Sequence, residues 1–107
     1  MSYFEIKGPM PPMITPFTAD GKVDFSAFSQ NIEKWNEYAL TGYLVLGSNG
    51  ESAYLSEEDK LELVRLTAKH ASPGKLIMAG TGVESTSATV RLTNQAADLG
   101  AKCALLL

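Results

Sequence analysis

The chain has 107 residues, of which 45% are hydrophobic and 20% charged, and its formal net charge is −3 at pH 7. This composition excludes disordered and collagen-like classes, and the scattered Lys and Arg residues argue against a nucleic-acid or anionic membrane surface. The lone Cys103 excludes a disulfide framework and a cysteine-rich metal site. No apolar run reaches the ~18 residues of a membrane span, and residues 1–8 lack the apolar core of a secretory signal, so we expect one cytoplasmic domain.

The first predicted strand covers residues 12–17, a short apolar segment bracketed by prolines. A helix is predicted to begin after Asp24, whose side chain suits the N-cap position. Apolar residues then recur at spacings of three and four, which places them on one face of a helix. These residues are Phe25, Phe28, Ile32, Trp35 and Ala39. We expect Trp35 to pack in the core and Gly42 to end the helix.

Residues 43–46 form a continuous apolar run, which is the pattern of a parallel strand buried on both faces. The turn 47–51, Gly-Ser-Asn-Gly-Glu, follows this run. Ser56 is predicted to cap a second helix, whose first turn carries acidic residues that favour the positive end of the helix dipole. That helix is expected to end before Pro73-Gly74.

A third apolar run covers residues 76–80, a third helix begins near Ser85 or Thr86, and a fourth strand covers residues 103–107. Strand and helix therefore alternate with a repeat of roughly 30 residues, which is the size of a βαβ unit. Such units build either an open doubly wound sheet or a barrel. The chain stops inside an apolar strand, whereas a complete barrel needs about 250 residues. We therefore predict that residues 1–107 are one α/β domain, the N-terminal part of a (β/α)8 TIM barrel, incomplete at its C-terminus.

Small polar residues follow the predicted strands, at the edge where barrel and doubly wound enzymes place their active sites. These residues are Thr15, Ser48, Asn49 and Thr81. In the turn 47–51, Gly47 and Gly50 allow a tight bend that leaves N–H groups free to bind an anion such as a carboxylate. The Ser48 hydroxyl can both donate and accept, as a proton relay requires. Any strand-to-helix turn also favours these residue types, so the spacing alone leaves a purely structural role open.

Short motifs occur in order along the whole chain. They are Pro11–Phe17, Asp20-Gly21, Val23-Asp24, Gly47–Glu51, Leu55-Ser56 and Ala79–Gly82. In this order and at these spacings they strongly resemble the dihydrodipicolinate synthase / N-acetylneuraminate lyase family. The Ser-Asn version of the turn, together with the segments Glu84–Thr86 and Ala88–Val90, looks most like the 4-hydroxy-2-oxoglutarate aldolase branch of that family.

The resemblance implies a (β/α)8 barrel, commonly a homotetramer, that binds pyruvate or another 2-oxo acid as a Schiff base on a lysine. Such an enzyme needs no metal or organic cofactor, because the protonated imine acts as the electron sink. The resemblance also implies that Ser48 and Asn49 hold the pyruvate carboxylate and that Ser48, as a catalytic residue, belongs to a proton relay. Thr15 would line the floor of the site and Glu51 would brace the turn. The full supporting set would be Thr15, Gly47, Gly50, Glu51 and Thr81.

The family's Schiff-base lysine and its catalytic tyrosine lie on later strands of the barrel, beyond Leu107. The seven lysines of this chain fall at termini, turns or helix faces. A Schiff-base lysine needs a desolvated pocket that lowers its pKa, so that the neutral amine can attack. The resemblance therefore implies a class I aldolase of which the isolated residues 1–107 are inactive.

Two other functions stay open at this point. A small doubly wound domain could bind phosphate through the turn 47–51, although the sequence has no G-x-G-x-x-G motif and no P-loop lysine. Alternatively, a non-catalytic half-barrel could complete its sheet with another chain, and we expect the chain alone to aggregate, oligomerise or be only partly ordered. His70 is expected to complement the end of its helix and Cys103 to be a small core residue, rather than catalytic groups.

Overall fold

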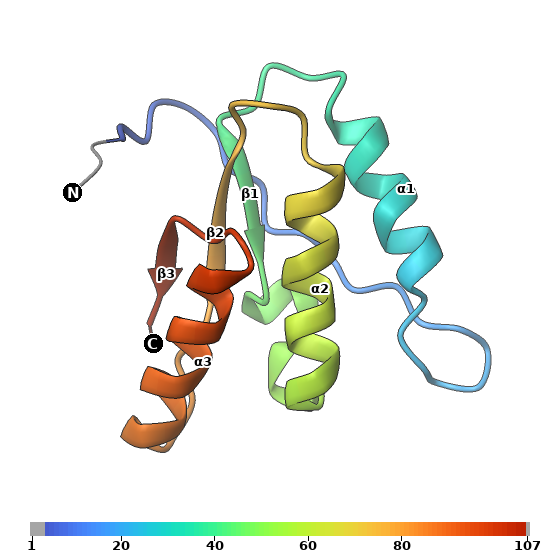
Figure 1. Cartoon of the computed structure of the whole chain (residues 1–107). Helices are drawn as coiled ribbons and strands as arrows, with labels where there is room; N and C mark the ends of the chain where they lie inside the picture. The colour runs from blue at the N-terminus through green and yellow to red at the C-terminus, as the bar shows by residue number, and fades with distance from the viewer. Residues whose placement is uncertain (1–3, 107) are drawn as a thin grey trace.

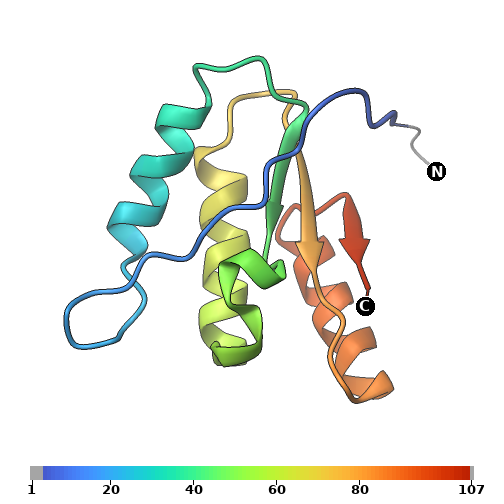
Figure 2. The same cartoon turned by 180° about the vertical axis from the view of Figure 1, so that it is seen from behind.

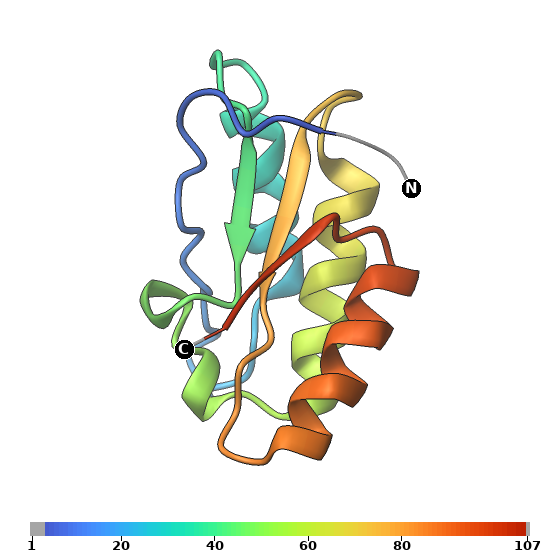
Figure 3. The same cartoon turned by 90° about the vertical axis from the view of Figure 1, so that its left-hand side faces the viewer.

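The computed structural model describes residues 4–106 as a three-stranded parallel sheet with its α-helices packed on one face (Figures 1 and 3). The strands are β1 (Gly42–Val45), β2 (Leu76–Gly80) and β3 (Cys103–Leu105). The helices are α1 (Phe25–Trp35), α2 (Glu57–His70) and α3 (Thr86–Asp98), and the short 3₁₀ helices η1 (Ser48–Gly50) and η2 (Ser52–Tyr54) follow β1. Leu107, the last residue of the predicted fourth strand, and residues 1–3 lie outside the described part.

The strand order is sequential, β1-β2-β3, and both pairings are parallel. Tyr43 aligns with Ile77 in the first pairing, and Met78 aligns with Cys103 in the second. The edge-on view in Figure 3 places α1, α2 and α3 on the same side of the sheet. A doubly wound sheet carries helices on both faces, so this arrangement favours the barrel and argues against the doubly wound alternative.

Gly42 is the first residue of β1. The sequence analysis predicted that it ends the first helix, and that prediction is wrong. It is buried opposite Leu76 of β2. A Cβ on Gly42 would lie 1.9 Å from the Leu76 carbonyl oxygen, so no larger residue fits. The glycine therefore marks a close backbone approach inside the sheet and not a helix C-cap.

The predicted first strand, residues 12–17, is not a regular strand in the structure. Its contact with β1 is an isolated parallel bridge between Pro12 and Leu44, in which the Met13 N–H donates to the Leu44 carbonyl (2.8 Å) and the Leu44 N–H donates to the Pro11 carbonyl (3.1 Å). Prolines lack the N–H that a longer ladder would need, which explains why the pairing stops. The segment nevertheless runs along β1, as Figure 2 shows, and occupies the place of a neighbouring strand.

The three helix starts agree with the sequence prediction. The side chains of Asp24, Ser56 and Ser85 accept hydrogen bonds from the N–H groups of Ala27, Asp59 and Ala88, respectively. Each is an N-cap that satisfies an N–H without a partner inside its helix. The caps therefore fix where each helix begins, and with it the length of the loop that precedes the helix.

The first helix ends at Trp35, one turn earlier than its apolar stripe suggested. Trp35 is 41% exposed, so the prediction that it packs in the core is wrong. Its ring lies 5.9 Å from the ring of Tyr38, at an interplanar angle of 51°. Asn36, which follows the helix, explains the early end: its amide donates to the His70 carbonyl (2.8 Å) while its Oδ1 accepts from the Tyr43 hydroxyl (2.7 Å).

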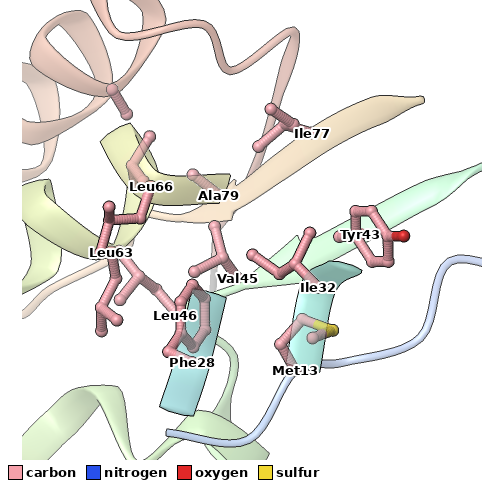
Figure 4. Packing of buried hydrophobic residues seen from close by; sticks show 12 residues of the cluster. Met13, Phe28, Ile32, Tyr43, Val45, Leu46, Leu63, Leu66, Ile77 and Ala79 are labelled. Carbon is pink, nitrogen blue, oxygen red and sulfur yellow. The ribbon is translucent and has the colours of Figure 1, made fainter. Parts of the chain in front are cut away.

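The hydrophobic core lies between the sheet and the helices, as the close view in Figure 4 shows. Val45 and Ala79 point into it from the strands, and Ile32 and Leu63 meet them from α1 and α2. On the opposite face of the sheet, the aligned residues Leu44, Met78 and Cys103 are only partly buried. The strands were predicted to be buried on both faces. Within residues 4–106 only the helical face is covered, and the other face is the one that a barrel would turn toward its interior.

Candidate functional site

The turn after β1 has an unusual backbone. Leu46 has φ 67° and Glu51 has φ 58°, so a left-handed residue stands on either side of η1. This conformation is uncommon for residues other than glycine, and for a branched side chain such as Leu46 it carries strain. Strained backbone of this kind concentrates at functional sites, where the surrounding structure holds it in place.

Thr15 fixes the turn 47–51 through a buried hydrogen bond. Its side chain is 6% exposed and its hydroxyl donates a hydrogen bond to the Gly50 carbonyl oxygen (2.6 Å), a contact that we call the Thr15 clamp. Gly50 is buried, and a Cβ there would lie 3.0 Å from the Met13 carbonyl oxygen and 3.3 Å from Thr15 Oγ1. The segment 12–17 therefore fixes the turn, and its pairing with β1 fixes that segment.

The side chains of Ser48 and Asn49 are exposed at the carboxyl end of β1. The backbone differs from the sequence-based expectation, because the Gly50 N–H donates to the Gly47 carbonyl and the Glu51 N–H donates to the Ser48 carbonyl, both at 3.0 Å. Those two N–H groups are used inside the turn and are not free for an anion. The exposed Ser48 hydroxyl and Asn49 amide remain as neutral donors at this end of the strand.

Glu51 contributes to the turn through its backbone. Its N–H donates to the Ser48 carbonyl and its own carbonyl accepts from the Tyr54 N–H (3.0 Å), which links η1 to η2. Its side chain is exposed. The hydrogen bonds that brace the turn therefore run through the main chain of Glu51, at a left-handed position, and not through its carboxylate.

Thr81 lies at the end of β2 but does not face the turn. It is fully buried, and its hydroxyl pairs with the Thr93 hydroxyl of α3 at 2.7 Å. Its N–H donates to the Leu105 carbonyl (3.2 Å), which extends the pairing of β2 with β3. The structure thus gathers Thr15, Ser48, Asn49, Gly47, Gly50 and Glu51 at one turn and places the Thr81 side chain elsewhere.

A surface groove of about 660 Å³ runs between the turn and the loop that follows β2. Ser48, Glu51, Tyr54 and Lys60 line one side, and residues 82–84 line the other. Sequence analysis missed Lys60 and Tyr54. The signal for Lys60 was its position in the first turn of the helix capped by Ser56, directly after the turn 47–51. Asn49 is not part of the groove lining and faces solvent beside it.

The other reactive side chains have structural surroundings. His70 Nδ1 lies 3.0 Å from Glu33 Oε1, a contact that joins α2 to α1. Burial raises the pKa of the Cys103 thiol, which disfavours the thiolate that a nucleophile needs. Among residues 4–106 no group of three or more His, Cys, Asp or Glu side chains is arranged to hold a metal ion. No helix in that range is long and apolar enough to cross a membrane.

The sequence matches the model of a known family over nearly its whole length. The model of the dihydrodipicolinate synthetase family covers residues 5–107. The chain belongs to this family. A 4-hydroxy-tetrahydrodipicolinate synthase from Psychrobacter arcticus is 35% identical over 102 residues, which are 95% of this chain and 34% of that protein. One from Methanothrix thermoacetophila is 37% identical over 101 residues, again 34% of the relative's length.

Solved structures agree on the fold. A putative dihydrodipicolinate synthetase from Pseudomonas aeruginosa superposes with a TM-score of 0.90 at 33% identity, over 95% of this chain and 35% of that one. N-acetylneuraminate lyase from Mycoplasma synoviae superposes with a TM-score of 0.85 at 29% identity, over 94% and 35% of the two chains. This member of the dihydrodipicolinate synthetase family therefore spans about a third of its relatives' length and matches the N-terminal part of their TIM-barrel fold. Its relatives carry synthase and lyase names, and a 4-hydroxy-2-oxoglutarate aldolase branch stays a prediction.

Proposed function

We propose that the chain supplies the carboxylate-binding part of a class I aldolase that acts on pyruvate and 2-oxo acids through a Schiff base. The observation that carries this proposal is the clamped turn at the carboxyl end of β1. There Ser48 and Asn49 present neutral donors on a backbone that Thr15 and Gly50 hold in a strained conformation. The synthase and lyase names of the family's other members support the same reaction class.

In this proposal the Ser48 hydroxyl and the Asn49 amide donate hydrogen bonds to the two oxygens of the substrate carboxylate. Donors that are already fixed in place orient the 2-oxo group, and no free energy is needed to reorient them during the reaction. Ser48 also relays a proton, because a hydroxyl can accept one while donating another. Thr15 is a positioning residue, since its own hydroxyl is committed to the Gly50 carbonyl.

The surroundings of the lysines support the inference that residues 1–107 carry no Schiff-base lysine. Lys7 and Lys22 lie in exposed ion pairs, and Lys75 donates to the carbonyls of Tyr38 and Leu40 (both 2.9 Å). Lys60 lies beside the groove on a helix and not on a strand. None of these lies in the apolar pocket that keeps an amine neutral at pH 7. The isolated chain would then bind a 2-oxo acid only weakly and would not turn it over.

Intact-mass spectrometry of the protein from its native source, with and without pyruvate and borohydride, tests the proposal. A longer polypeptide that contains this sequence and gains one reduced pyruvyl group is the expected result. An adduct on one of the seven lysines of a 107-residue species would contradict the assignment of the lysine to a later strand. A 107-residue species without an adduct would remove the aldolase activity and favour a non-catalytic half-barrel.

The finer assignment is a 4-hydroxy-2-oxoglutarate aldolase-type or dihydrodipicolinate synthase-type enzyme that works as a cytoplasmic homo-oligomer, commonly a tetramer in this family. The Ser-Asn pair at residues 48 and 49 favours the aldolase type. Release of pyruvate from 4-hydroxy-2-oxoglutarate by the native-source protein is the expected activity. Adduct formation without this cleavage would keep the Schiff-base chemistry and reject the branch. Light scattering of the same sample would report the oligomeric state.

A further inference from the structure

The turn after β1 contains an Asn-Gly dipeptide, Asn49-Gly50, with an exposed asparagine side chain. Asn-Gly is the dipeptide in which the asparagine amide is most easily lost, because glycine offers no side chain to block the approach of its nitrogen to the amide carbon. The chain has three other asparagines, Asn31, Asn36 and Asn94, and each is followed by a residue with a side chain. The turn is therefore the place in this molecule where covalent change is expected first.

The structure opposes removal of the Asn-Gly pair by a larger residue at position 50. Gly50 is buried, and an added Cβ would lie 3.0 Å from the Met13 carbonyl oxygen, which is backbone and cannot move aside cheaply. The fold therefore favours glycine directly after Asn49. The same fold also restrains the reaction, because Asn49 is held in a 3₁₀ helix with its successor's N–H and carbonyl both in use.

Ring closure needs a Gly50 nitrogen that is free. In the structure the Gly50 N–H donates to the Gly47 carbonyl (3.0 Å), and the Gly50 carbonyl accepts from Thr15 Oγ1 (2.6 Å). The nitrogen must leave its hydrogen bond and rotate toward the side chain, which local opening of the turn allows. We propose that Asn49 is a site of spontaneous deamidation whose rate is set by opening of the Thr15 clamp.

The chemistry needs only water. The Gly50 nitrogen, after loss of its proton, attacks Cγ of Asn49, so a new N–Cγ bond forms and a five-membered succinimide closes. The bond from Cγ to the side-chain nitrogen breaks, and that nitrogen leaves as ammonia after taking up a proton. Water then adds to either ring carbonyl and opens the ring, giving aspartate or isoaspartate at residue 49. No oxidant, reductant or metal takes part.

The product adds a negative charge at residue 49 to a turn that already carries the Glu51 carboxylate. This consequence rests on the proposed function: a carboxylate at residue 49 would repel the substrate carboxylate that the Asn49 amide is proposed to bind. Isoaspartate would also add a backbone atom to a turn that has no spare room at Gly50. Deamidation would thus act as an ageing reaction that removes binding and loosens the turn together.

The test follows amide loss by peptide mapping of the chain incubated in buffer at neutral pH, in parallel with the same chain in urea. Asn94, exposed on α3 and followed by Gln95, is the internal reference. We expect Asn49 to be converted slowly in buffer, much faster in urea, and ahead of Asn94 in both. Equal rates for Asn49 in buffer and in urea, or no lead of Asn49 over Asn94 in urea, would overturn the proposal.

Two substitutions at Thr15 measure how much the Thr15 clamp slows deamidation of Asn49. Thr15→Val removes the hydroxyl at nearly constant volume and is expected to raise the Asn49 rate in buffer about fivefold, the change in opening that loss of one hydrogen bond produces. Thr15→Ser keeps the donor and should stay close to the wild type. An unchanged deamidation rate in Thr15→Val, with helical circular dichroism retained, would contradict the proposal that opening of the Thr15 clamp sets this rate. The mass readout does not depend on pyruvate binding, so failure of the proposed function would leave this result standing.

Discussion

The ends of β1 and β2 follow the same sequence pattern, a small hydroxyl residue beside glycine after an apolar strand, yet they have different roles. After β1, Ser48 is exposed on a strained turn that Thr15 clamps from a separate segment. After β2, Thr81 is fully buried and its hydroxyl meets Thr93 of the next helix. The difference arises because Thr81 directly continues β2 and points toward α3, whereas Ser48 lies in the 3₁₀ helix η1, beyond the left-handed Leu46. The end of β1 leaves its hydroxyl exposed, and the end of β2 uses its hydroxyl to attach a helix.

The largest expected effect on the free energy of unfolding comes from the contact between the ends of β1 and β2. In Gly80→Ala, the new Cβ would lie 2.1 Å from the Leu46 carbonyl oxygen at the end of β1. Backbone cannot yield to such an overlap, so we expect a loss of roughly 3 kcal/mol or more in the free energy of unfolding, measured in urea.

The matched control is Gly47→Ala. Gly47 has φ −76° and ψ 178°, which any residue adopts, and its Cβ would meet only the Leu44 side chain at 3.4 Å. We expect a change within about 1 kcal/mol. Equal losses for the two variants would show that the strand ends do not constrain each other through Gly80.

The next effect tests the clamp itself. Thr15→Val leaves the buried Gly50 carbonyl without its donor, and we expect a loss of about 1–3 kcal/mol in unfolding free energy. Hydrogen exchange at the Gly50 N–H should accelerate in the same variant. Thr15→Ser restores the donor, and a loss as large as that of Thr15→Val would place the cost in packing of the methyl group rather than in the hydrogen bond.

Substitutions at Thr81 and Ser48 are expected to have smaller effects on the free energy of unfolding, and they distinguish pyruvate binding from stability. Thr81→Val leaves the Thr93 hydroxyl without its partner, at a cost of about 1 kcal/mol. Ser48→Ala alters an exposed side chain and should change stability by no more than about 0.5 kcal/mol. If the proposed function holds, pyruvate-induced NMR shifts at the turn disappear in Ser48→Ala and persist in Thr81→Val. The reverse pattern would assign the chemistry to the end of β2.

The smallest effect concerns the helices that follow the two strand ends. Arg91 of α3 donates two hydrogen bonds (both 3.1 Å) to the carboxylate of Glu57 at the start of α2, and this holds the pKa of Glu57 below its ordinary value of 4.5. The ionised form is therefore favoured by folding, so the contribution is present above about pH 4.5 and lost as the pH falls through the folded-state pKa.

Melting temperatures of the wild type and Arg91→Gln, compared between neutral pH and pH 3, measure this contribution. The difference should be largest at neutral pH, shrink on acidification and shrink with added salt, because the pair is exposed. A difference that grew on acidification would contradict the assigned direction of the Glu57 shift.

Local features of the fold were predictable because their causes are local. The caps at Asp24, Ser56 and Ser85 depend on hydrogen bonds that span three residues, so the sequence contains all the information. The alternation of strand and helix followed in the same way, but by itself it left a barrel and a doubly wound sheet both open. The clustering of polar residues at Ser48 and Asn49 also follows from where a parallel strand ends.

The errors arose where distant segments meet. Residues 12–17 looked like a strand, but a strand needs a continuous ladder that its prolines cannot supply. Trp35 fitted the apolar stripe of its helix, but Asn36 ends that helix through contacts 34 and 36 residues away. The contacts of Thr81 and Gly42 were not predicted for the same reason, because their partners, Thr93 and Leu76, can be found only once the sheet and helices are assembled.

The uncovered face of the sheet bears on how such a protein is made. Each strand finds its neighbour one crossover later in the chain, so β1, β2 and β3 can pair in the order in which a ribosome releases them. Until the rest of the chain is released, Leu44, Met78 and Cys103 stay partly accessible to solvent on a sheet whose other face is already packed. A nascent chain in this state offers an apolar surface to molecular chaperones. We therefore expect translation speed and chaperone supply to govern the soluble yield of this sequence more than its helices do.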